Sequence, residues 1–187
     1  EYNRDKGLSV TVYLGQKRGN ASTSDFSPQA IRDTVAAALS IARYTAEDDC
    51  AGLAEKDRLA RDYPQLALYF PWQLSVEQAI ELAKECEQAG FAADPKITNS
   101  EGATVSTSES QFIYANSLDF MGGYPISRHS VSCALIAEHN ESKQRDYWYS
   151  VARDAVDLES AQEIGRKTGL RSAARLGARK IATCEVP

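Results

Sequence analysis

Apolar and polar residues alternate near the start of the chain, over Leu8–Leu14. This period of two is typical of a strand that buries one face. Gly15-Gln16-Lys17 then predicts a turn. The stretch Arg18–Ser24 that follows is polar and small, so a strand there has little apolar surface to bury.

Three stretches combine a helical period with helix-start signals. A serine that can act as the N-cap precedes each, followed by a proline in the first case and by a glutamine or glutamate in the other two. The three starts are Ser27-Pro28, Ser75 to Gln78, and Ser160 to Glu163. The second helix is expected to end at Gly90 and the third near Gly177.

The first two predicted helices each carry an apolar stripe, which we expect to lie on the same side of one sheet. The stripes are Ile31, Val35, Ala38, Leu39 and Ala42, and Val76, Ala79, Ile80, Ala83 and Cys86. Between the helices, Thr45–Trp72 follows no period, and loops of this length are more often binding surfaces or lids than inert spacers.

The region from Lys96 to Asn140 is rich in β-branched, aromatic and serine residues. Gly102 and Gly122-Gly123 predict tight turns between successive antiparallel strands. Lys143–Ala152 predicts the next strand, joined through a hairpin loop at Glu138–Ser142. We therefore expect a meander.

A last strand is expected at Lys180–Val186. The whole pattern predicts an α+β fold, a largely antiparallel sheet with about three helices packed on it.

Composition adds limits on the class of protein. A net charge of -5 argues mildly against nucleic acid or an anionic membrane as a partner. No apolar run approaches the roughly 20 residues that a membrane-spanning helix needs. The four cysteines lie far apart with no CxxC pair, which favours reduced thiols and a cytoplasmic protein. Because the chain starts at Glu1 rather than methionine, we interpret it as a fragment, and a lost targeting segment stays open.

Candidate chemistry is sparse. His129 and His139 bracket one predicted strand, and ten residues at about 3.3 Å each place them roughly 33 Å apart, too far to share a metal. The sequence contains no HExxH, GxSxG or Walker-type loop. We therefore expect no catalytic residue and no metal site in this chain, and we leave open whether it is an enzyme.

His129 shares a predicted strand face with Val131, Cys133 and Leu135, whereas Arg128 points the other way. The ordinary interpretation of His129 is a partly buried, hydrogen-bonded side chain, and the alternative is a base beside a nucleophile. Arg128 is either solvated or a clamp for a carboxylate or peptide carbonyl. Tyr147 on the next strand either packs or binds.

Lys167, Arg171 and Arg175 form the only basic stripe in the predicted helices. Cations near a helix C-terminus are favoured by the helix dipole, so a solvated or partner-facing stripe is the simplest interpretation. Phosphate binding is the alternative, and contact with nucleic acid is unlikely on the acidic net charge.

Several strings resemble the PmbA (TldE) family in their order and spacing. They are Gly7–Tyr13, Lys17–Ser22, Phe26–Ile31, Ala42–Thr45, Cys50–Gly52, Glu77–Leu82, Ile97–Gly102 and Ser127–Ser130. No single string is decisive, but together they cover almost the whole chain. With Asn99 lying in one of these strings, our candidates for substrate or partner binding are Asn99, Arg128, His129 and Tyr147.

The resemblance implies a single N-terminal α/β domain over residues 1–187, with a C-terminal domain absent. It implies a cytoplasmic, non-catalytic partner of TldD in a metallopeptidase that degrades or matures unfolded peptides. In that family TldD carries the zinc on a HExxxH helix, so no cofactor is expected in this chain. The alternatives are the front half of a catalytic TldD-like metallopeptidase and a regulator that contacts DNA gyrase or DNA through the basic helix.

Overall fold

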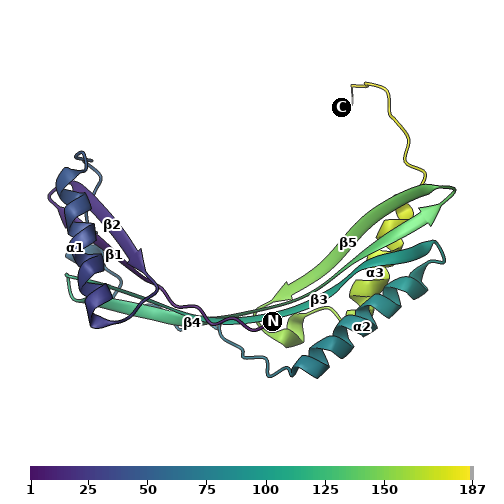
Figure 1. Cartoon of the computed structure of the whole chain (residues 1–187), viewed down its shortest axis with the longest axis horizontal. Coiled ribbons are helices and arrows are strands. Elements are labelled where there is room, and N and C mark those ends of the chain that lie inside the picture. Colours follow the sequence, from purple (N-terminus) through teal and green to yellow (C-terminus); the bar gives the residue numbers. More distant parts are fainter. Residues whose placement is uncertain (186–187) are drawn as a thin grey trace. The chain divides into compact units, whose positions relative to one another are not determined.

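The computed structural model describes residues 1–185 and confirms the α+β class. Three α-helices accompany two antiparallel sheets, β1-β2 and β3-β4-β5 (Figure 1). The chain divides into two compact units, Glu1–Tyr63 and Pro64–Pro187. The single domain expected from the sequence thus contains two compact units, and their folding as one domain stays a prediction.

The first unit is a β-hairpin covered by one helix. Strands β1 (Leu8–Leu14) and β2 (Lys17–Thr23) are joined through Gly15, whose φ of +60° suits glycine. Helix α1 (Pro28–Tyr44) begins where predicted, and the Ser27 hydroxyl accepts a hydrogen bond from the Ala30 N–H. The local signals at the start of the chain therefore define this unit.

Strand β2 packs against helix α1 through a glycine rather than through apolar side chains. A Cβ on Gly19 would collide with the backbone of Ala38 and Ala42 on α1. This close approach turns Thr34, Ala38 and Ala42 inward and leaves Val35 43% exposed. The predicted stripe is therefore wrong at Val35, because strand and helix meet at small residues.

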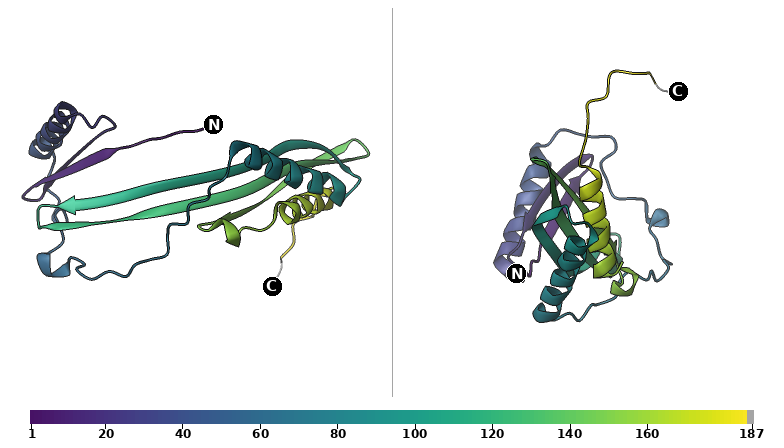
Figure 2. Two further views of the ribbon diagram at one scale, coloured as in Figure 1. Left: turned by 90° about the horizontal axis from the view of Figure 1, so that it is seen from below. Right: turned by 90° about the vertical axis from the view of Figure 1, so that its right-hand side faces the viewer.

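The second unit contains the meander predicted from the sequence. Strands β3 (Ile97–Asn116), β4 (Phe120–His139) and β5 (Ser142–Ala152) lie side by side in chain order. The β3-β4 hairpin is longer than β5 and continues past its end (Figure 2). A stretch of the hairpin therefore has only two strands.

The turns predicted at glycines are wrong. Gly102 lies inside β3 beside an irregularity of the ladder, and Gly123 lies inside β4 opposite Ile113. A Cβ on Gly123 would meet the backbone of β3, so this glycine serves close packing. The β3-β4 hairpin turns instead near Asp119, whereas the β4-β5 hairpin turns at Asn140, within the predicted loop; both residues have positive φ.

Helices α2 (Val76–Ala93) and α3 (Ala161–Ala174) cover one face of this sheet (Figure 1). Helix α2 starts with the predicted capping box at Ser75 but continues through Gly90. A Cβ on Gly165 of α3 would collide with the Cys86 carbonyl, and one on Gly169 with the Gly90 carbonyl. Gly90 therefore lies at a helix contact, and its prediction as a helix end is wrong.

Other expectations for the helices need correction. The first two helices pack on separate sheets, not on one. On α2, Val76 and Ile80 are exposed, because α3 contacts the face that carries Cys86 and Gly90. Helix α3 ends at Ala174, close to the predicted Gly177.

The predicted last strand is wrong for residues 180–185, which form no strand, and Val186 lies outside the described residues.

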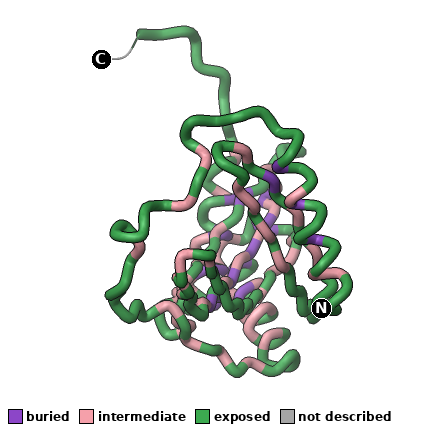
Figure 3. Tube along the Cα trace, turned by 90° about the vertical axis from the view of Figure 1, so that its left-hand side faces the viewer, coloured by how far each residue is buried: buried purple, intermediate pink, exposed green. Residues whose placement is uncertain are grey.

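The segment between α1 and α2 is irregular, as predicted, apart from a single 3₁₀ turn at Lys56–Arg58. Buried positions are concentrated in the helices and sheets, while most of the irregular connections are exposed (Figure 3). Among the described residues, no helix is long and apolar enough to cross a membrane.

Candidate functional site

His129 is completely buried, on the sheet face that also holds Val131, Cys133 and Leu135. Its Nε2 lies 2.8 Å from the Phe70 carbonyl oxygen, and its Nδ1 lies 2.8 Å from the Thr107 hydroxyl. The edge of the Trp72 ring packs against the imidazole at a centroid distance of 5.5 Å. This arrangement confirms the interpretation of His129 as a hydrogen-bonded, buried side chain.

The partners of His129 fix its tautomer. A carbonyl oxygen only accepts hydrogen bonds, so Nε2 carries the proton donated to Phe70. In the neutral ring Nδ1 then accepts from the Thr107 hydroxyl. Both ring nitrogens are occupied, which leaves neither to act as a base toward a nucleophile or as a metal ligand.

Ser127, two residues earlier on the same strand face, holds the same segment. Its N–H donates to the Leu68 carbonyl at 2.9 Å, and its hydroxyl accepts from the Phe70 N–H at 2.8 Å. The hydroxyl also donates to the Arg153 carbonyl at 2.8 Å. Together, Ser127 and His129 fasten the end of the irregular connection, Leu68–Trp72, to β4.

The other three candidate residues lie on the opposite face of the sheet, which no helix within residues 64–185 covers. Arg128 is exposed, and its side chain forms no ion pair with the described residues. Tyr147 is half exposed and pairs with Ala134, six residues along β4, so it lies about 20 Å from Arg128. Asn99 pairs with Ile136, and its side-chain oxygen accepts from the Ser100 N–H.

The four candidates therefore form no single site. His129 is separated from the others by the sheet itself, and Arg128 is too far along β4 to act with Tyr147 or Asn99 on one small molecule. Tyr147 stacks on Tyr149 at 6.2 Å, with the Arg145 guanidinium 5.7 Å from its ring. The open face is thus a polar and aromatic surface.

The basic stripe on α3 is engaged within the unit. Lys167 lies 2.7 Å from Glu159, and Arg171 lies 3.2 Å from the nearly buried Asp146. Both cations also lie over the ring of Trp148, at 5.4 and 5.1 Å. Arg175 is more loosely paired with Asp146, at 3.9 Å. These carboxylates offset the positive charge that a phosphate-binding stripe requires.

The buried thiols behave as small apolar groups. Cys86 and Cys133 lie in the core of the second unit, as expected from their places in the sequence. The neighbouring Cys133 sulfur and burial both raise the pKa of the Cys86 thiol. Among the described residues, no group of three His, Cys, Asp or Glu side chains is placed to hold a metal ion.

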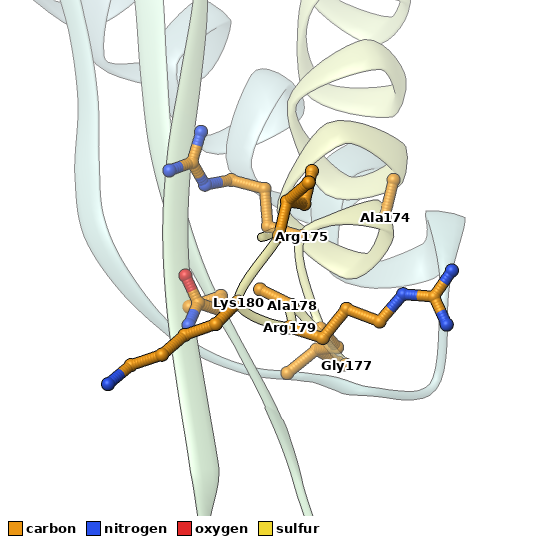
Figure 4. Close-up of a pocket in the computed structure, with 9 residues that line it drawn as sticks. Ala174, Arg175, Gly177, Ala178, Arg179 and Lys180 are labelled. Carbon is orange, nitrogen blue, oxygen red and sulfur yellow. The ribbon is translucent and has the colours of Figure 1, made fainter. Parts of the chain in front are cut away.

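An open hollow of about 730 Å³ lies at the C-terminal end of α3, lined by Gln144 and residues 174–181. Figure 4 shows that the side chains of Arg179 and Lys180 point in opposite directions. The cations do not converge on one point, so the hollow is not built as an anion site.

The comparison with family models decides which family this is. The model of the PmbA/TldA metallopeptidase central domain matches residues 69–176, more than half of the chain. The chain belongs to the PmbA/TldD family. The model of PmbA/TldA metallopeptidase domain 1 matches residues 1–42. The two matches fall in the second and the first compact unit, respectively.

Relatives of known name support this membership. Metalloprotease PmbA of Escherichia coli O157:H7 is 44% identical over all 187 residues, and the Haemophilus influenzae homologue is 42% identical. The chain spans 42% of the length of each.

Solved structures share the fold. A proposed modulator of DNA gyrase from Bacteroides thetaiotaomicron superposes with a TM-score of 0.84 and 25% identity, covering 94% of this chain and 40% of that one. TldE from Thermococcus kodakarensis superposes with a TM-score of 0.68 and 11% identity, covering 89% and 41%.

Sequence reasoning missed the residues that organise these surfaces. Ser127 and Thr107 hold His129 and the Leu68–Trp72 segment, and Asp146 binds the basic helix. Ser127 could have been found, because it shares the strand face of His129 by the period of two. Thr107 and Asp146 depend on strand register, which no local pattern in this sequence specifies.

Proposed function

We propose that this chain is the front part of a non-catalytic, PmbA-like subunit of a cytoplasmic TldD/TldE-type metallopeptidase that degrades or matures unfolded peptides. The observation that carries the proposal is the 44% identity to metalloprotease PmbA along the entire chain. The surfaces of the second unit agree with a binding role, because Asn99, Arg128 and Tyr147 lie on an open sheet face rather than in an enclosed site.

The described residues do not fit a zinc site. His129, the only buried histidine, uses both ring nitrogens in hydrogen bonds to Phe70 and Thr107. His139 lies at the far end of β4, about 33 Å away along the strand. The proposal therefore assigns the zinc to a TldD-like partner, on its HExxxH helix, and routes no chemical step through this chain.

A reconstitution experiment tests the proposal. The purified chain, the full-length protein that contains it, and the TldD-like protein of the same organism are assayed alone and in pairs against an unfolded peptide. We expect hydrolysis by the pair of the two full-length proteins, abolished by a zinc chelator, and none by the chain alone.

Two outcomes would contradict the proposal. One is peptide turnover by the isolated chain. The other is a HExxxH motif further along the same polypeptide, which would make the chain the front half of a catalytic subunit.

A further inference from the structure

The three-stranded sheet has outer edges at which another chain could pair, and two stretches of edge are protected. On β5, Lys143 and Arg145 place charges at the edge, and the Asp146 carboxylate accepts from the Tyr147 N–H. On the part of β4 that extends past β5, Leu68 occupies the Ser127 N–H, and Pro125 has no N–H to offer.

The outer edge of β3 has much less protection between Ser106 and Ala115, where Glu109 is the one charged residue and its carboxylate accepts a hydrogen bond from the Tyr69 hydroxyl. All ten residues are exposed, and the ladder to β4 is regular throughout. The stretch contains no proline, lysine or bulge, which are the usual devices that block an edge. Within residues 64–185 this edge is therefore open to an added strand.

The register identifies the main-chain groups available on this edge. The Ser127 N–H points away from β3, toward Leu68, so its partner Glu109 directs its own N–H and carbonyl away from β4. The same holds for every second residue, namely Thr107, Glu109, Gln111, Ile113 and Ala115. None of these five amides has a hydrogen-bond partner within residues 64–185.

We propose that the outer edge of β3, from Ser106 to Ala115, binds an extended peptide by strand addition. This inference rests on the proposed function and deepens it, because it assigns the surface on which an unfolded substrate lies. Donors and acceptors that recur at every second residue match an extended backbone, which a folded or helical partner does not present.

The neighbouring side chains define the peptide that fits best. Phe112 and Tyr114 are 54% and 43% exposed on the open face, and Ile113 is 62% exposed on the other. An added strand places its side chains beside these residues on both faces. The site therefore prefers β-branched or aromatic residues, which become accessible when a protein unfolds.

Peptide chemistry tests the proposal on the unmodified chain. The probe is a fluorescein-labelled heptapeptide of alternating valine and threonine with a lysine at each end, titrated by anisotropy. One derivative is N-methylated at alternate residues, which leaves the N–H groups along one edge of the peptide free to donate. A second derivative is N-methylated at every internal residue.

We expect the singly blocked peptide to bind within about threefold of the parent, and the fully methylated peptide at least about tenfold more weakly, because it offers no main-chain donors. Equal binding of all three would overturn the proposal, since it would show attraction through side chains alone.

A matched pair of variants then locates the site. Gln111→Pro removes one outward N–H without breaking the ladder to β4, and Gln111→Ala keeps it. We expect only the proline variant to lose affinity, by about fivefold or more, with both variants equally folded by circular dichroism.

Two results would contradict peptide binding at this edge. One is equal affinity of the two variants. The other is a dimer of the chain that the proline variant dissociates, which would assign the edge to a second copy. Binding without hydrolysis in the reconstituted pair would refute the proposed function and leave this edge intact.

Discussion

At the scale of single residues, adjacent positions on β4 have opposite roles. His129 is fully buried with both nitrogens bonded, whereas Arg128 is exposed on the open face. Alternation along a strand produces this contrast, since neighbouring side chains point to opposite faces. His129 therefore stabilises the fold, whereas the Arg128 side chain is accessible to a ligand.

Replacing His129 tests its structural role. His129→Ala removes the partner of the half-buried Phe70 carbonyl and of the Thr107 hydroxyl and leaves a cavity at a fully buried position, so we expect the free energy of unfolding to fall by about 3 kcal/mol. Urea denaturation measures the loss, with Arg128→Ala as the control, expected within about 0.5 kcal/mol of wild type. Equal stability of the two variants would show that the hydrogen bonds of His129 contribute nothing.

At the scale of elements, helix starts and strand periods were predictable, whereas the turns predicted at Gly102 and Gly122-Gly123 and the helix end predicted at Gly90 were wrong. Ser27, Ser75 and Ser160 each cap the helix that follows, because a cap depends only on the next few residues. Gly90 and Gly123 carried the signals of a helix end and a turn. Both instead lie where the backbone closely approaches another strand or helix, a requirement that the adjacent residues do not reveal.

The same reason limits prediction of the site. The face of His129 followed from the period of two, but its partners Phe70 and Thr107 lie 59 and 22 residues away. No local pattern reveals such partners. The choice of Arg128, Tyr147 and Asn99 as binding residues stays a prediction.

The contact between α2 and α3 gives a test at this scale. Gly165→Ala places a methyl group against the Cys86 carbonyl, so the helices must separate, and we expect a loss of about 3 kcal/mol in the free energy of unfolding. Gly52→Ala is the control, because a Cβ there meets nothing within 4 Å. A stable Gly165→Ala variant, measured by thermal and urea unfolding, would contradict this close packing.

At the scale of the whole molecule, the two units are contiguous in sequence, with the boundary between Tyr63 and Pro64. The family models match the two units separately. The exposed connection before Leu68 carries Lys56, Arg58 and Arg61, outside any helix or strand except the single 3₁₀ turn.

Limited proteolysis tests this division. Apart from the exposed sites near the two ends of the chain, we expect trypsin to cut first after Lys56, Arg58 or Arg61, because exposed irregular backbone is cleaved most readily. Mass spectrometry identifies the cut, and the fragment that begins at Asp62 should keep its near-ultraviolet dichroism from Trp72 and Trp148. If trypsin degrades both fragments as soon as the connection is cut, neither unit is stably folded without the other.

The order of strands in the meander also bears on how the second unit assembles. Each strand pairs with its neighbour in the chain, and the tip pairing of Asn116 with Phe120 closes only a short loop. Pairing can start there and extend residue by residue toward Ile97 and Ala137. Each new pair then costs little additional loop-closure entropy. Such local nucleation spares the three strands of the meander a search for distant pairing partners.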